Sequence, residues 1–233
     1  MIMKAMLLSF VIGVTVSACA SAALVLTPGD AIIGGEVVGA GFLQGRSGAG
    51  PGNSWPVAES PSDAINGFFG GSGEKYLNRG GQDTGMIITP TTGPSIVTSL
   101  TLWNANDVDG RRPTSFSLLG TNATILDGGE GFSHSLSLFT PIASGPTGLP
   151  VGTNNPRRPV VGPPYTEGLR STVSFANDTA YTSYLLYFPT LANQFSWMQI
   201  SEVALDGTVV PEPSTALLGF LGSVFLMRRR RQA

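Results

Sequence analysis

Short runs of β-branched and aromatic residues, separated by turn-forming residues, fill the middle of the chain. Eight of them lie at residues 32–38, 86–89, 95–103, 115–119, 136–142, 172–175, 181–188 and 197–205. Several alternate apolar and polar side chains, which is the period of a half-buried β-strand. The 31 glycines and 17 prolines favour tight turns over long helices. The pattern predicts an all-β fold, a β-sandwich of the jelly-roll kind.

Two stretches between these runs are rich in glycine, proline and asparagine. They cover residues 39–61 and 145–164, and both are expected to be long loops. Within the run 95–103, the side chains of Ile96, Leu100 and Leu102 share one parity. Alternate residues of a strand face the same side of a sheet, so these three are expected to face the core.

The last run places a carboxylate among apolar residues. Met198, Ile200 and Glu202 share a parity, so Glu202 is expected to be buried if the other two face the core. A buried carboxylate is costly unless it is paired, protonated or bound to a hard cation such as Ca²⁺. The alternative to a bound cation is an ion pair of Glu202 with Lys75 or Arg79.

The first 22 residues have the order of a secretory signal peptide. Lys4 precedes an apolar run at residues 7–16, and small residues follow. Ala20-Ser21-Ala22 has the A-x-A pattern that signal peptidase accepts, which predicts cleavage after Ala22.

One alternative concerns Cys19, the only cysteine of the chain. Val16-Ser17-Ala18-Cys19 resembles a lipobox, so a lipidated Cys19 would give the protein an N-terminal acyl anchor. The A-x-A pattern just after it favours loss of Cys19 with the signal peptide.

The other end of the chain combines a proline-containing motif, a short apolar run and a cluster of arginines. The motif consists of Val210, Pro211, Glu212, Pro213 and Ser214, the apolar run covers residues 215–227, and the arginines occupy residues 228–231. The prolines prevent a helix from beginning earlier, and the arginines stay on the cytoplasmic side of a membrane. A helix of this length spans roughly 20 Å against about 30 Å of hydrocarbon, which is short for a permanent anchor.

This arrangement resembles the PEP-CTERM sorting signal of Gram-negative bacteria. The resemblance implies that exosortase cuts near the motif while the apolar helix holds the precursor transiently in the inner membrane. The product would then reach the cell surface or the extracellular matrix, where such proteins accompany exopolysaccharide. An ordinary tail anchor would not need Pro-Glu-Pro. The expected divisions are a signal peptide at 1–22, a β-sandwich domain at 23–208 and the sorting signal at 209–233.

A second resemblance covers roughly residues 58–207. The pieces SPSDAINGFF, EKYLN, GMIITP, SIVTSLTLWNANDVDGRRPTSFSLLGTN, YTSYLLYFP and SWMQISEVALDG follow in an order similar to galactose-binding-like, discoidin-type jelly rolls. The resemblance implies a structural Ca²⁺ held by the loop at Ala64 and Asn66 together with Glu202. Asn66 stands where related carbohydrate-binding modules have an aspartate, which removes one negative charge from the site.

Charge and composition exclude several functions. Only eight of the thirteen basic residues lie between the signal peptide and the end of the Pro-Glu-Pro motif, against all fifteen acids, so the mature chain carries about seven net negative charges. That balance argues against binding nucleic acid. The mature chain has no cysteine, and the one histidine, His134, lies in a glycine-bounded segment without a G-x-S-x-G motif. An enzyme is therefore not expected.

The expected function is a non-catalytic module that binds exopolysaccharide or another glycan through exposed aromatic residues. Trp55, Phe132 and Tyr165 lie in glycine-rich or loop segments and are the candidate sugar contacts, whereas Trp103 and Trp197 are expected in the core. The alternatives are a structural surface or biofilm protein without a discrete ligand and, third, a secreted hydrolase.

Overall fold

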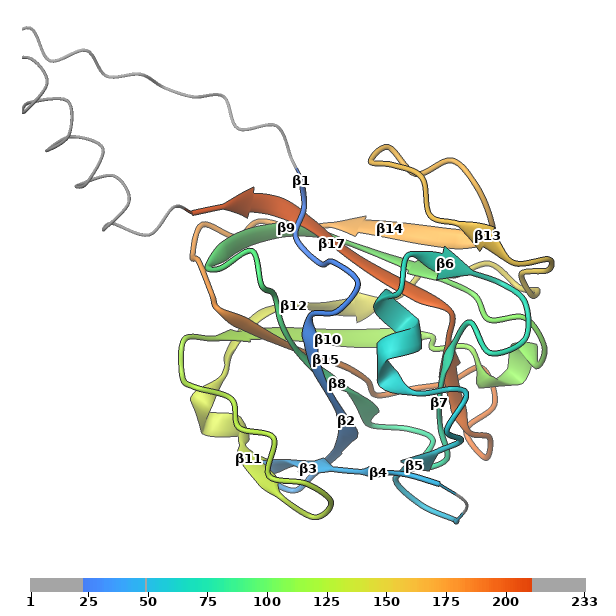
Figure 1. The fold of residues 1–233 in the computed structure, drawn as a ribbon, viewed down its shortest axis with the longest axis horizontal. Coiled ribbons are helices and arrows are strands. Elements are labelled where there is room, and N and C mark those ends of the chain that lie inside the picture. Colours follow the sequence, from blue (N-terminus) through green and yellow to red (C-terminus); the bar gives the residue numbers. More distant parts are fainter. Residues whose placement is uncertain (1–22, 49, 211–233) are drawn as a thin grey trace, which may run out of the picture.

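The computed structural model describes residues 23–48 and 50–210, which form two antiparallel β-sheets packed face to face (Figure 1). The larger sheet has the strand order β11 (Ser133–Ser135), β3 (Gly41–Gln44), β2 (Ala31–Val38), β8 (Thr84–Thr89), β15 (Ser183–Phe188), β10 (Ser115–Thr121) and β12 (Thr140–Pro146). The smaller sheet has the order β1 (Ala23–Leu24), β17 (Glu202–Val209), β9 (Ser95–Trp103) and β14 (Arg170–Ser174). The chain crosses repeatedly from one sheet to the other. The predicted all-β sandwich is confirmed.

Short elements fill the connections. Three further pairs of short strands are present: β13 (Arg158–Pro159) pairs with β6 (Phe68–Phe69), β16 (Met198–Ile200) with β7 (Tyr76–Asn78), and β4 (Arg46–Ser47) with β5 (Ser54–Trp55). Helix in the described residues is limited to the 3-10 turns η1 (Pro61–Ile65), η2 (Asp109–Arg111) and η3 (Leu136–Leu138). Two expectations were wrong locally. The run 136–142 divides into η3 and the start of β12, and the expected loop 39–61 contains β3, β4 and β5.

The main core lies between the two sheets. The larger sheet contributes Met86, Phe116, Leu186 and others, all almost fully buried. The smaller sheet contributes its own apolar row from two neighbouring strands, namely Val97, Leu100, Leu102, Val203 and Leu205. Burying side chains of this size is worth about 1.5–3 kcal/mol each, which makes this interface the main source of stability.

A β-bulge changes the parity of β9. Asp206 pairs with Ser99 and the next residue, Gly207, pairs with Val97, so Thr98 has no partner across the ladder. As a result Val97 joins the core together with Leu100 and Leu102, while Ile96 is only half-buried. The expectation for Leu100 and Leu102 is confirmed. The expectation for Ile96 was wrong because the unpaired Thr98 changes which side chains of β9 face the core.

The chain also covers the outer face of each sheet. The segment between β10 and β12 brings Phe139 against Phe42 and Leu185 on the larger sheet. The long connection between β12 and β14 brings Tyr165 against Trp103 of the smaller sheet. These two connections therefore form a further layer of packing, one on each side of the sandwich.

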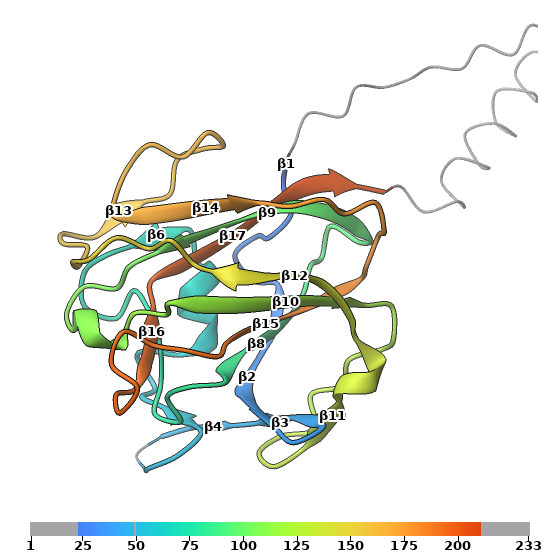
Figure 2. The ribbon, with the colours of Figure 1, turned by 180° about the vertical axis from the view of Figure 1, so that it is seen from behind.

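Both ends of the described chain lie at the same end of the sandwich. β1 pairs with the last part of β17, with Ala23 opposite Gly207, and both strands lead to the same side of the molecule (Figures 1 and 2). Within the described residues no helix has the length and apolar character needed to cross a membrane. The predicted signal peptide at 1–22, with Ala20 and Ala22, lies outside the described residues. So does the predicted sorting segment from Pro211 onward.

The bulge leads to a stability prediction. Leu100→Ala removes a fully buried side chain and should lower the free energy of unfolding by about 2–5 kcal/mol. Ile96→Ala should lower it clearly less, because Ile96 lies outside the core cluster. Urea unfolding of the two variants measures both values. Equal losses would mean that β9 runs through without a bulge.

Candidate functional site: the loop end with Phe195 and Trp197

Glu202 is buried, but not on the face that its sequence parity suggests. Met198 and Ile200 pack in the core, Ser201 separates β16 from β17, and Val203 is the next core residue. Glu202 therefore points to the outer face of the smaller sheet, where it pairs across the ladder with Trp103. Its exposed fraction is only 4% because the long connection between β12 and β14, together with β6, covers this face.

The surroundings of Glu202 leave one carboxylate oxygen without a partner. Oε1 accepts a hydrogen bond of 3.0 Å from the Gly67 amide, which a left-handed backbone (φ +82°) directs toward it. Oε2 is buried and has no hydrogen-bond partner among the described residues. Burial raises the pKa of Glu202 well above its usual range. The expected pairing with Lys75 or Arg79 does not occur, since Lys75 pairs with Glu59 and Asp107 and Arg79 donates to the Gly48 carbonyl.

The residues expected to hold Ca²⁺ are close to Glu202. Ala64 lies buried in η1, and Asn66 follows that turn directly. The Asn66 amide nitrogen donates to Glu74 Oε2 at 2.8 Å, while its oxygen accepts from the Phe68 amide at 2.9 Å. The described residues contain no group of three or more His, Cys, Asp or Glu side chains that could hold a metal. Carbonyl oxygens would have to complete a site here, and the orphaned Glu202 Oε2 is the observation that fits one.

Two of the three expected sugar contacts are buried. Trp55 packs edge-on against Tyr76 with 8% of its surface exposed. Tyr165 packs edge-on against Trp103, and its hydroxyl donates to Asp206 at 2.7 Å. Both expectations were wrong about exposure, because Trp55 joins the main core and Tyr165 belongs to the connection that covers the outer face of the smaller sheet. Phe132 is 39% exposed and remains a prediction.

The most exposed aromatic residues lie instead in the connection between β15 and β16. Phe195 is 90% exposed and Trp197 is 42% exposed, although Trp197 was expected in the core. The loop is held in place by its own turn, in which the Asn193 side chain accepts from the Phe195 amide at 3.0 Å. The sequence did contain a signal that was overlooked, since Phe195 stands alone between the polar Gln194 and Ser196.

Two arginines from different segments approach the Trp197 ring. The guanidinium carbon of Arg111 lies 4.7 Å from the ring centroid, and that of Arg79 lies 5.7 Å from it. At these distances the ring face attracts the cation. Arg79 follows β7 and Arg111 ends η2, so three separate segments meet at this tryptophan.

A buried lysine holds the η2 segment in position. Lys75 is 2% exposed, and its Nζ lies 2.7 Å from Asp107 Oδ2 and 2.9 Å from Asn106 Oδ1. Burial alone would raise the pKa of Asp107, but hydrogen bonds from Lys75 and the Val108 amide outweigh it and lower that pKa. Gln199 of β16 adds a hydrogen bond of 2.8 Å to the Val108 carbonyl. The η2 segment is thus held in place by Lys75 and Gln199.

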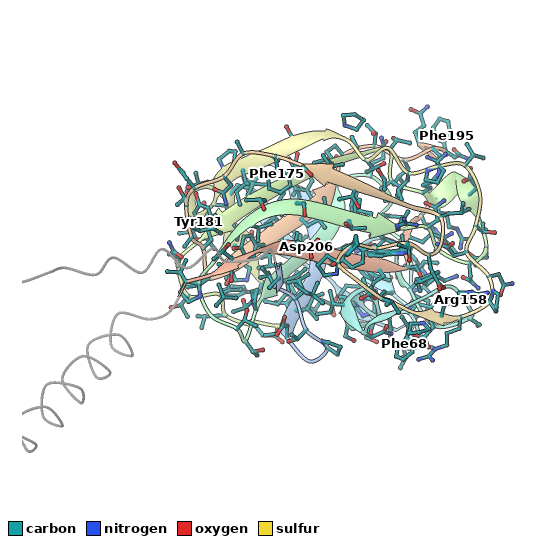
Figure 3. The ribbon with its side chains drawn as sticks, turned by 90° about the horizontal axis from the view of Figure 1, so that it is seen from above. Phe68, Arg158, Phe175, Tyr181, Phe195 and Asp206 are labelled. Carbon is teal, nitrogen blue, oxygen red and sulfur yellow. The ribbon has the colours of Figure 1, made fainter. Side chains whose placement is uncertain are left out.

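This loop end lies opposite the ends of the described chain. Tyr181 bonds to Ser95 at 3.0 Å, and Ser95 is paired with Val209, the last residue of β17. Figure 3 places Tyr181 and Phe195 at opposite ends of the sandwich. Figure 2 shows η2 beside the β15–β16 connection at the same far end, in agreement with the hydrogen bond of 2.8 Å from the Asn193 amide to the Gly110 carbonyl.

No protein-family model and no curated protein sequence matches the chain. Among solved structures, the chain is similar to the family 32 carbohydrate-binding module of EndoD from Streptococcus pneumoniae, at 14% identity over 80% of this chain and 100% of that one, with a TM-score of 0.47. It is also similar to the family 32 module of NanJ from Clostridium perfringens, in complex with galactose, at 13% identity over 65% of this chain and 88% of that one, with a TM-score of 0.41. A third is chitosan-binding module 1 from the chitosanase/glucanase of Paenibacillus sp. IK-5, at 10% identity over 78% and 96%, with a TM-score of 0.43. These values are too low to transfer a ligand or a site to this chain.

Proposed function

We propose that the protein is an exported, non-catalytic carbohydrate-binding module whose loop end around Phe195 and Trp197 binds polysaccharide. The observation that carries the proposal is the exposure of Phe195, 90% of whose surface faces solvent next to a second exposed aromatic ring. Covering an aromatic side chain of this size is worth about 1.5–3 kcal/mol, so a ligand that covers it gains binding energy. A sugar ring offers a flat C–H face that can do so.

The surroundings of the aromatic pair suit a sugar better than an apolar ligand. The arginine side chains of the neighbouring segments offer N–H donors to hydroxyl groups, and Trp197 between them is only partly covered. Sites of this type combine apolar contact with a few polar groups on loops held by a rigid scaffold. Lys75 and Gln199 supply that rigidity here.

Catalysis has little support from the side chains present. His134 is 5% exposed, and its ring lies edge-on against Phe132 at 5.0 Å between centroids. Burial lowers the pKa of His134, and its Nε2 atom has no hydrogen-bond partner in the described structure. A general base needs a substrate proton within hydrogen-bond reach, which the covering ring prevents.

We also propose that the loop at Ala64 and Asn66, with Glu202, holds a structural Ca²⁺. The ion would neutralise the buried carboxylate and tie η1 to the first residue of β17. Oxygen ligands of this kind suit Ca²⁺, and the second lone pair of the Asn66 side-chain oxygen is free to join them. The ion would contribute to stability and not to ligand binding, since Lys75 and Gln199 hold the loop end with Phe195 in place.

Export and sorting complete the proposal. Signal peptidase would remove residues 1–22, and exosortase would process the segment 209–233 after transient insertion in the inner membrane. The placement of the loop end supports this, because a chain attached through the end of β17 would turn Phe195 away from its point of attachment (Figure 3). The product would sit at the cell surface or in the matrix with its binding loops outward.

Phe195→Ala should weaken binding to exopolysaccharide roughly tenfold, or about 1.4 kcal/mol, because the contact surface is lost. Its effect on unfolding should stay within about 0.5 kcal/mol, because the ring is exposed. Affinity electrophoresis in polysaccharide gels measures the binding, with Leu126→Ala, 59% exposed, as the control. Loss of binding in Phe132→Ala but not in Phe195→Ala would place the site on the other loop.

Saturating Ca²⁺ should raise the melting temperature of the chelator-treated protein. At a concentration a hundred times the dissociation constant, the gain is about 2.7 kcal/mol. Glu202→Gln should abolish the shift, whereas Glu130→Gln, an exposed glutamate, should keep it. If wild-type protein melts at the same temperature in Ca²⁺ and in chelator, the proposed Ca²⁺ site does not exist.

In a strain without exosortase, the protein should accumulate in the inner-membrane fraction at its unprocessed mass. In the wild-type strain it should appear at the surface or in the medium, shortened at its C-terminus. Immunoblotting of cell fractions together with intact-mass measurement tests this, and replacing Pro211 and Pro213 by alanine should reproduce the mutant pattern. Identical fractions in the two strains would rule out exosortase processing.

A further inference from the structure

The two arginines beside Trp197 differ from most arginines of the described residues in having no close acidic partner. Seven arginines lie between residues 23 and 210. Four of them form ion pairs of 2.5–3.4 Å with a carboxylate. Arg79 has no carboxylate within 4.0 Å among the described residues, and Arg111 has only Asp107 at 3.9 Å.

That one contact of Arg111 is weak for a specific reason. Asp107 Oδ2 is already engaged by the buried Lys75 at 2.7 Å, so its charge is largely neutralised before Arg111 reaches it. Arg79 meets only uncharged acceptors, the Gly48 carbonyl at 2.7 Å and the Ser54 hydroxyl at 3.4 Å. Each guanidinium therefore keeps most of its charge available to a ligand.

Both guanidinium groups also keep unused hydrogen-bond donors. The hydrogen bonds and ion pairs of their side chains with described residues all involve the Nη1 atom. The Nε atom of Arg111 is buried and has no partner among those residues. An arginine has five N–H donors, so the described residues leave the Nη2 group of each of these two arginines free to donate to an anion.

The acids of this loop end are engaged by other cations. Glu59 and Asp107 pair with Lys75, and Asp109 pairs with Arg112. Arg79 and Arg111 are therefore the two weakly paired cations beside Trp197. Weakly paired cations next to an exposed ring favour an anionic ligand.

We propose that the polysaccharide bound at this loop end is acidic. Its carboxylate or sulfate group lies on the sugar that covers Phe195 or on the neighbouring sugar. The anion is held by the Nη2 groups of Arg79 and Arg111, whose guanidinium carbons lie 5.7 and 4.7 Å from the centroid of the Trp197 ring. This inference rests on the proposed function and adds the class of sugar to it. Arginine suits the task because it stays charged and binds planar anions through two bonds.

The experiment compares polymers that differ only in their charge. Binding of the mature protein is measured by affinity electrophoresis to polygalacturonate and to the same polymer after carboxyl reduction, and to dextran sulfate and unmodified dextran. We expect at least about tenfold tighter binding to the acidic member of at least one pair, decreasing as salt is raised from 50 to 500 mM. The pair that responds identifies the anion as carboxylate or sulfate.

Variants then assign the preference to the two arginines. Arg79→Gln and Arg111→Gln should each reduce binding to the acidic polymer about tenfold and leave binding to the neutral polymer within twofold. Arg158→Gln is the matched control, because it removes an exposed arginine that is already paired with Glu167 and lies apart from Phe195 in Figure 3. Its binding should be unchanged. If Arg111→Gln does not fold, Arg79→Gln and the salt dependence decide.

The possible outcomes separate this inference from the proposed function. Equal binding to the acidic and neutral members of both pairs, lost in Phe195→Ala, would overturn the inference and leave the carbohydrate site in place. A preference for acidic polymers that survives both arginine substitutions would also overturn it. Binding to none of the polymers, and to no exopolysaccharide, would overturn both.

Discussion

The ladder between β9 and β17 is the interaction on which the rest of the structure depends. It spans the whole length of β17, from Glu202 opposite Trp103 to Val209 opposite Ser95. One face of this ladder supplies the apolar row that the smaller sheet contributes to the main core, and the other carries Trp103, Glu202 and Asp206 beneath the long connection between β12 and β14. Because β17 follows β16 after Ser201 and ends at the last described residues, it also fixes the distance between the loop end and the C-terminal end of the described chain. Eight residues of strand correspond to roughly 27 Å.

The use of the long glycine- and proline-rich segments explains where the exposed aromatic residues are. These segments return over the outer faces of the sheets, so the aromatic side chains they carry become part of the packing. Tyr165 contributes its ring to Trp103 and its hydroxyl to Asp206, and burial of the latter raises its pKa despite that bond. Phe195, in contrast, belongs to the connection between β15 and β16, and its side chain is 90% exposed. An exposed aromatic ring is informative here because so many others in the same protein are covered.

The sequence predicts the strands better than their faces. Runs such as 95–103 coincide with observed strands, because alternation and β-branched residues are local signals. Parity was wrong where a single residue leaves the ladder: Thr98 in β9 and Ser201 between β16 and β17 each turn the following side chains to the other face. Nothing in the identity of those residues marks the change, since it depends on the register of the partner strand. The burial of Glu202 was predicted for the wrong reason. The exposure of Trp197 was missed because this residue was assigned to a strand, whereas it lies in the connection just before β16.

The site depends on contacts that no local pattern contains. Arg79, Arg111 and Trp197 come from three segments, and they meet only because β7 pairs with β16 and because the buried Lys75 fixes the loop that precedes η2. Lys75 has a further consequence for the charge of the site. A buried ammonium group must be paired, and because Lys75 lies 2.7 Å from Asp107, it leaves Arg111 with only a contact of 3.9 Å to the same carboxylate. Because the buried Lys75 must be paired, the guanidinium group of Arg111 stays available to a ligand.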